Sequence, residues 1–298
     1  MRETASAYFR DLQGRICEGL ERLEGSGRFG EDAWERPGGG GGRARVLVDG
    51  ALFEKAGVNF SEVHGALAPE LERAMPGDGP SFFATGVSLV LHPRSPMVPT
   101  VHANLRFLER GRTAWFGGGT DLTPYYPFRE DVVHFHRVLR DACAAFGPDA
   151  YARFKAECDR YFYLPHRGET RGVGGIFFDY LQGELELLFG FVRAVGEAFL
   201  PAYAPIAERR RAEPYGEPER EWQLLRRGRY AEFNLLYDRG TVFGLKTGGR
   251  AESILMSLPP RVRWAYDAHP APGSREAELL EYLRAQDWLG AEPTVSAR

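Results

Sequence analysis

The sequence has few cysteines and no long apolar run. Cys17, Cys143 and Cys158 form no CxxC pattern, which argues against an iron–sulfur cluster held by local cysteines. Their odd number in a chain of 298 residues also argues against a secreted disulfide framework. No stretch of 18 apolar residues predicts a membrane-spanning helix, and the charged N-terminus MRETASAYFRDLQ lacks the apolar segment of a signal peptide. These features predict a soluble, cytoplasmic protein.

Lysine is also scarce, and it occurs only at positions 55, 155 and 246. A GC-rich genome explains this excess of arginine, so the position of an arginine is informative whereas the number of arginines is not. The net charge of −3 argues against a general nucleic-acid binder. The five glycines Gly38 to Gly42 precede no Lys-Ser/Thr pair and fit no GxGxxG pattern, so we expect a flexible loop there and no nucleotide site.

Hydrophobic spacing predicts strands in groups and helices elsewhere. Helices are expected over 5–24, 62–75, 129–145, 149–163, 181–225 (broken near Pro201 and Pro214) and 274–289. Strands are expected over 44–49, 81–108, 230–237, 241–246 and 252–258. Grouped strands without regular βαβ alternation predict an α+β fold, in which a large antiparallel sheet is flanked by helices on both sides. No break in composition marks a linker, so we expect a single domain over 1–298.

Two strand-like stretches, 82–92 and 98–108, carry polar side chains at alternate positions. Because alternate side chains of a strand point to opposite faces, Val101, Ala103, Leu105 and Phe107 form an apolar face. Thr100, His102, Asn104 and Arg106 form the other face. The first stretch divides likewise, with Val87, Leu89 and Leu91 against Ser88 and His92. This polar face is typical of a site for an anionic molecule that requires proton transfer.

Three further segments carry candidate site residues. Gly117 to Gly119 precede Thr120 and Asp121, which predicts a tight loop where a ligand approaches Asp121, or alternatively an Asp that only stabilises a turn. At about 100° per residue, His136 lies near the apolar stripe of its helix and His134 nearly opposite. Alternation over 226–250 places Glu232, Asn234 and Asp238 on one strand face. Arg250 follows a glycine turn, where it can clamp a carboxylate or lie free on a surface loop.

Six segments together resemble the oxygen-dependent coproporphyrinogen III oxidases of haem biosynthesis. They are EKAGVNFSEVHG, HANLRF, WFGGGTDLTPYYPF, YFYLPHRGETRGVGGIFFDYL, RRGRYAEFNLLYDRGT and FGLKTGGRAESILMSLPP, and the resemblance runs from about residue 30 to the C-terminal region. It implies the conversion of two propionates of coproporphyrinogen III to vinyl groups, which yields protoporphyrinogen IX and CO2. It also implies O2 as electron acceptor and no flavin or nicotinamide cofactor.

The resemblance also implies roles for individual residues. Those implied to bind substrate are Ser88, Asn104, Leu105, Arg106, Gly248, Gly249 and Arg250. His102 is implied to be the proton donor, and Asp121 and Arg171 lie in motifs linked to catalysis. A divalent metal is implied on His92, His102, His136 and His166, and a homodimer contact is implied around Tyr230 to Tyr266.

Physical reasoning on the substrate adds further expectations. An electron-rich porphyrinogen can reduce O2 directly, so the protein supplies orientation and proton transfer. Arg106, Arg250 and Arg171 are candidates to hold propionates, and Asp121 is a candidate acceptor for pyrrole N–H groups. Four imidazoles without a carboxylate suit zinc, copper, iron or nickel better than manganese. We expect the histidines to act mainly in hydrogen bonding and proton transfer. A porphyrin carrier without turnover and a metal-dependent hydrolase remain alternatives.

Overall fold

The computed structural model describes residues 1–67, 75–246 and 249–290. Its centre is one antiparallel sheet of order β1-β2-β3-β4-β5-β6-β9, in which neighbouring strands follow one another along the chain up to β6. The strands are β1 (Gly30–Glu35), β2 (Gly40–Val48), β3 (Phe53–Ala66), β4 (Ser81–Pro93), β5 (Thr100–Arg110), β6 (Thr113–Thr123) and β9 (Gly174–Leu181). A separate short hairpin pairs β7 (Tyr163–Leu164) with β8 (Glu169–Thr170).

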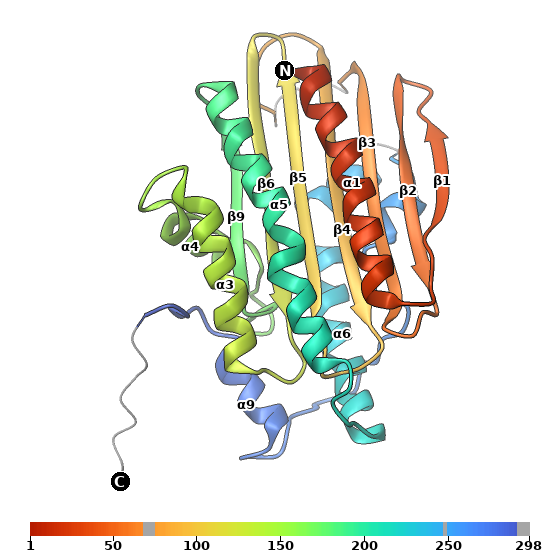
Figure 1. Cartoon of the computed structure of the whole chain (residues 1–298), viewed down its shortest axis with the longest axis vertical. Helices are drawn as coiled ribbons and strands as arrows, with labels where there is room; N and C mark the ends of the chain where they lie inside the picture. The colour runs from red at the N-terminus through yellow and green to blue at the C-terminus, as the bar shows by residue number, and fades with distance from the viewer. Residues whose placement is uncertain (68–74, 247–248, 291–298) are drawn as a thin grey trace.

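Helices lie on both sides of this sheet, which confirms the predicted α+β class (Figure 1). They are α1 (Arg2–Glu24), α3 (Arg129–Ala144), α4 (Ala150–Tyr161), α5 (Leu185–Arg210), α6 (Glu217–Leu236), α7 (Arg239–Lys246), α8 (Ala251–Leu255) and α9 (Arg275–Tyr282). In Figure 1, α1 and α5 cross the near face of the sheet, and α6 lies behind it. Helix α4 packs against the edge strand β9.

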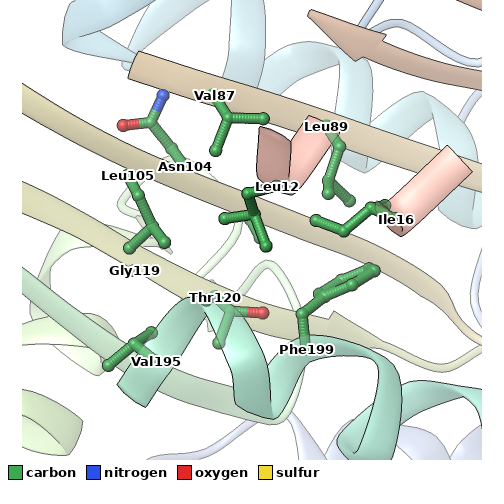
Figure 2. A pocket seen from close by; sticks show the side chains of 12 residues that line it. Leu12, Ile16, Val87, Leu89, Asn104, Leu105, Gly119, Thr120, Val195 and Phe199 are labelled. Atoms are coloured by element: carbon green, nitrogen blue, oxygen red, sulfur yellow. The ribbon is translucent and has the colours of Figure 1, made fainter. Parts of the chain in front are cut away.

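The near face carries the apolar core, as the alternation in β4 and β5 predicted. Val101, Leu105 and Phe107 are buried together with residues of α1 and α5, such as Leu12 and Phe199. Figure 2 shows side chains from both helices and three strands meeting around a cavity of about 10 Å³. That volume holds at most one water molecule, so this cavity is a packing gap and not a substrate site.

The far face is covered only in part. Lys55 Nζ donates to the carbonyl of Leu258 at 2.9 Å, and His92 Nε2 lies 2.9 Å from the carbonyl of Ser257. The side chain of Met256 lies directly over Gly57, where a Cβ would displace its terminal methyl group. The segment after α8 therefore closes the end of the sheet where β3 begins and β4 ends. The remainder of this face, further along β3, β4 and β5, stays open.

Helix α5 is long and apolar enough, by length and composition alone, to cross a membrane. Half of its most apolar window is buried inside the fold. Its buried residues, including Val192, Val195 and Phe199, join the core cluster. The core helix of a soluble protein has the same character, and the packing of α5 places it in that class. Pro201, which we expected to break this helix, lies inside it, and the break falls at 211–216.

Several sequence-based boundaries are wrong. The predicted strands over 230–237, 241–246 and 252–258 are α6, α7 and α8. Alternation of Phe233, Leu235 and Tyr237 suggested a strand, but the buried positions of α6 recur at helical intervals. At the start of the helix the Glu219 carboxylate accepts from the backbone N–H of Gly216 at 2.8 Å, which is one half of a capping box.

The glycine-rich segments also differ from expectation. Gly40 to Gly42 begin β2 instead of forming a flexible loop, and Gly117 to Asp121 lie within β6 instead of a tight turn. Both runs are held by hydrogen bonds from strands on either side, which offset the low strand propensity of glycine. The predicted helix over 62–75 begins inside β3, and residues 68–74 lie outside the described residues.

Candidate active site

A hollow of about 160 Å³ lies on the open far face of the sheet. It is lined by Asn59, Ser61, Ala84, Thr85, Gly86, Val87, Ser88, Asn104, Arg106 and Leu108. Antiparallel register sets Ser88 opposite Asn104, and Asn104 opposite Gly119. Three of the residues predicted to bind substrate, Ser88, Asn104 and Arg106, therefore meet in one place.

Gly86 and Gly117 have no side chains, so they leave the sheet surface beside this hollow open. Gly86 lies opposite Arg106, and Arg106 lies opposite Gly117. A Cβ at Gly117 would lie 2.6 Å from Asp179 Oδ1 and 2.9 Å from Arg106 Nε. Glycine in a strand interior weakens the strand and often marks a close approach by a ligand or another group. Here it leaves room for the pair formed by Arg106 and Asp179.

His102 lies one step further along the same face and pairs with a buried acid. Register places it opposite Asp121, and its Nδ1 lies 2.8 Å from Asp121 Oδ1. Alternate residues of a strand are about 7 Å apart, so His102, Asn104 and Arg106 form a row of that spacing along β5. His102 keeps 20% of its side chain exposed, whereas Asp121 keeps 1%. The histidine is thus the accessible member of the pair.

Behind Asp121 lies Arg171, which is itself buried. Its Nη2 lies 2.7 and 2.8 Å from the two carboxylate oxygens of Asp121, and its Nη1 donates to Asn234 Oδ1 at 2.7 Å. The guanidinium also lies 4.1 Å from the ring centre of Phe162 and 4.4 Å from that of Tyr230. Aromatic faces attract cations, so this cage holds Arg171 in place without exposing it to a ligand.

The opposite charges of Asp121 and Arg171 stabilise each other. Burial alone raises the pKa of Asp121, but the charge of Arg171 and the hydrogen bond from His102 outweigh it and hold the pKa below its ordinary value. Burial lowers the pKa of Arg171, but the Asp121 charge more than compensates and raises it. Asp121 is therefore an anion, and it accepts a hydrogen bond from His102, whose Nδ1 carries the proton. This arrangement leaves His102 Nε2 as the nitrogen that can exchange a proton with a ligand.

This geometry corrects two expectations about direct contact. Arg171 was a candidate to hold a propionate, but it is buried and its donors are taken by Asp121 and Asn234. Asp121 was a candidate acceptor for pyrrole N–H groups, but both its oxygens already accept from Arg171 or His102. Both residues are buried, and His102 is the exposed member of their hydrogen-bonded group.

The two candidate propionate arginines are each paired with an acid. Arg106 Nη2 lies 2.9 Å from Asp179 Oδ1, and its Nη1 donates to Asn104 Oδ1 at 3.0 Å. Arg250 pairs with Asp32 of β1 and lies 3.6 Å from Glu252. A substrate carboxylate at either arginine has to compete with these acids.

The remaining residues predicted to bind substrate lie in different surroundings. Leu105 turns its side chain into the apolar core, away from the hollow, and is 3% exposed. Gly249 is exposed, and Gly248 lies outside the described residues.

The four histidines implied as metal ligands do not come together. His92 lies against Thr100 Oγ1 and the Ser257 carbonyl, His136 against Tyr151 Oη and the Val173 carbonyl, and His166 against Glu232 and Tyr237 Oη. Both ring nitrogens of each are within 3.2 Å of these partners. Within the described ranges, no group of three or more His, Cys, Asp or Glu is placed to hold a metal ion. These residues do not fit a four-histidine metal site.

His136 points inward, as its helical phase predicted, and it is fully buried, while His134 is half-buried. Burial lowers the pKa of His136 to about 3, so this imidazole stays neutral. Its partners are Tyr151 and the carbonyl of Val173 in the core behind β9. The hydrogen bonds of His136 therefore stabilise the core, and this residue lies away from the open face.

We expect removal of divalent metal to leave most of the activity intact, because both ring nitrogens of His92, His136 and His166 are already hydrogen-bonded. The measurement is turnover before and after dialysis against a strong chelator, with metal content followed by elemental analysis. Loss of activity that is restored stoichiometrically by one divalent ion would show that the histidines do form a metal centre.

Sequence reasoning missed several residues around the hollow. Asn59 and Ser61 lie on β3, and Asp179 lies at the end of β9. A signal for the first two was present, because Ala56, Val58 and Phe60 alternate with Lys55, Gly57, Asn59 and Ser61 as in β5. No local signal marks Asp179, since its role depends on pairing with Arg106 of a distant strand.

The open face thus combines a flat polar floor, an arginine beside a hollow and a histidine backed by a buried acid. Such features are typical of an enzyme that orients an anionic molecule and transfers protons. A family model described as coproporphyrinogen III oxidase matches residues 4–288 of the chain. The chain belongs to this family, the oxygen-dependent enzymes of haem biosynthesis that carry out oxidative decarboxylation.

Proposed function

We propose that coproporphyrinogen III binds on the open face of the sheet, over Ser88, Asn104 and Arg106, with the propionate that reacts near His102. The observation that carries this proposal is that the hollow and the His102–Asp121–Arg171 chain lie on one face, two residues apart along β5. A tetrapyrrole is larger than the hollow, so part of the macrocycle extends along the strands toward His102.

The reaction at each propionate has a simple balance. The carbon–carbon bond to the carboxylate breaks, CO2 leaves, and the carbon next to the pyrrole loses one proton, so that a vinyl group forms and two electrons are released. O2, the electron acceptor that the family uses, takes the two electrons together with two protons and becomes hydrogen peroxide. We assign the proton to His102 Nε2, and Asp121 stabilises the imidazolium that results. The electron-rich macrocycle supplies the electrons, so no flavin or nicotinamide is needed.

Arg106 and Arg250 bind propionates by exchanging a carboxylate of the protein for one of the substrate. Arg106 releases Asp179, and Arg250 releases Asp32, when a substrate carboxylate takes the same donors. Arginine offers a planar pair of donors that suits a carboxylate. This exchange reduces the net gain in affinity, but it keeps both guanidinium groups oriented before the substrate arrives.

We propose a homodimer with contacts around Tyr230 to Tyr266. Support comes from exposed large apolar side chains in this segment, namely Leu235, Leu236, Tyr237, Leu245, Trp264 and Tyr266. A segment that exposes several large apolar side chains is a candidate protein interface. We also propose a single domain, because one apolar core includes residues from Ala5 to Trp288. We place the enzyme in the cytoplasm.

The function is tested with coproporphyrinogen III under air and under nitrogen. We expect CO2 and divinyl product only under air, because O2 takes the electrons. Binding without any product under air would indicate a porphyrin carrier, and equal product under nitrogen would exclude O2 as the acceptor. His102→Ala serves as the matched variant, and it should bind substrate but form little product.

A further inference from the structure

Asn59 lies in the same row as the two polar residues already assigned to the substrate. Register sets Asn59 of β3 opposite Ser88 of β4, which in turn lies opposite Asn104 of β5. Cα partners in adjacent strands point their side chains to the same face. The three side chains therefore form one line across the floor of the hollow, and all three line it.

The carboxamide of Asn59 lacks a partner in the part of the chain that the structure describes. Its Oδ1 is buried and accepts no hydrogen bond there. An unsatisfied buried polar group costs about 1–3 kcal/mol, and such groups in native proteins call for an explanation. A ligand that supplies the missing donor is an explanation that fits a residue lining a hollow.

The other amide and carboxylate oxygens near this floor already accept from donors of the protein. Asn104 Oδ1 accepts from Arg106, and Asp179 accepts from Arg106 and approaches Arg239 at 3.4 Å. The carboxylate of Asp121 is filled by Arg171 and His102. A ligand that brings N–H donors to this face therefore finds the Asn59 oxygen as an acceptor without a competing partner.

We propose that Asn59 Oδ1 accepts a hydrogen bond from a pyrrole N–H of the substrate, an inference that rests on the proposed function. The carboxamide turns about its terminal bond to present the oxygen to the ring. Every pyrrole nitrogen of a porphyrinogen carries a hydrogen, whereas only half of the ring nitrogens of the oxidised, planar porphyrin do. Asn59 thus favours the reduced macrocycle, which is the form that can give up electrons.

The test compares binding of coproporphyrinogen III and of coproporphyrin III under nitrogen, where no turnover occurs. Asn59→Leu keeps the approximate size and removes the acceptor, while Asn59→Asp keeps an acceptor oxygen. One neutral hydrogen bond is worth about 0.5–1.5 kcal/mol, so Asn59→Leu should raise the Kd for coproporphyrinogen about 2- to 13-fold. Its Kd for coproporphyrin should change less than twofold, and Asn59→Asp should retain the preference for the reduced ligand.

Val63→Ala is the matched control, because Val63 lies on the same strand and face but outside the hollow. We expect wild-type affinity for both ligands in that variant. If Asn59→Leu raises the Kd of both ligands equally, or of neither, Asn59 does not distinguish the ligands by their N–H groups and the inference is wrong. Wild-type protein that binds coproporphyrinogen but releases no CO2 under air would overturn the proposed function alone. Failure of the wild type to bind it would overturn both.

Discussion

Asp121→Asn is expected to lower kcat by about 10²- to 10⁴-fold, the usual cost of losing one well-placed acid–base group. The carboxylate fixes the proton on His102 Nδ1 and stabilises the imidazolium, and an amide does neither. Steady-state turnover with coproporphyrinogen III under air measures this effect. Substrate affinity, measured under nitrogen, should stay near that of the wild type because Asp121 is buried behind His102.

The same substitution also leaves the buried guanidinium of Arg171 without its counter-charge. Removing one partner of a buried pair costs about 3–5 kcal/mol of stability, so the melting temperature should fall as well. A second variant, Asp121→Asn with Arg171→Met, separates the two effects, because methionine suits the aromatic cage. Stability should recover in the double variant while kcat stays low. Turnover near the wild-type value in either variant would remove Asp121 from the mechanism.

Arg106→Lys is expected to raise KM for coproporphyrinogen III by about tenfold or more, since a charged hydrogen bond contributes about 1.5–3 kcal/mol. Lysine is a point charge and cannot keep Asn104 and a carboxylate in place together as the arginine fork does. The second decarboxylation requires the mono-vinyl intermediate to bind in a new orientation. With a weaker clamp at position 106, we expect this intermediate to accumulate. Chromatographic separation of the mono-vinyl intermediate from the final product follows both steps.

Arg112→Lys provides the control for Arg106→Lys. Arg112 lies in the turn after β5 and pairs with Asp78, and its side chain is 92% exposed. This variant should show wild-type kinetics in both steps. Wild-type kinetics in Arg106→Lys as well would show that Arg106 does not clamp a propionate.

The sequence predicted the polar face of β4 and β5 because strand alternation is a local property. Ser88, His102, Asn104 and Arg106 could be placed on one face from spacing alone, and they are found there. The family resemblance then named the chemistry. Alternation misled us in α6, where four apolar residues at alternate positions fit a strand over a short window and also fit a helix.

The position of Asp121 could not be derived from its local sequence. Three glycines before it suggested a turn, but β5 and β9 on either side hold this segment as a strand. Its partner Arg171 lies 50 residues further along the chain, and Asn234 lies 63 residues beyond that. Contacts at such separations depend on how the elements pack, and short-range periodicity carries no record of them.

The pairing of β5 with β6 has a consequence for how the enzyme can change in evolution. His102 and Asp121 meet because residues 102 and 121 are register partners, counted back from the short turn at Gly111 and Arg112. Extra residues in that turn leave the count within the strands intact, and loops generally tolerate insertions. Deletion of one residue between the turn and His102 moves every side chain before it to the opposite face. The contact between His102 and Asp121 therefore depends on the register of the hairpin.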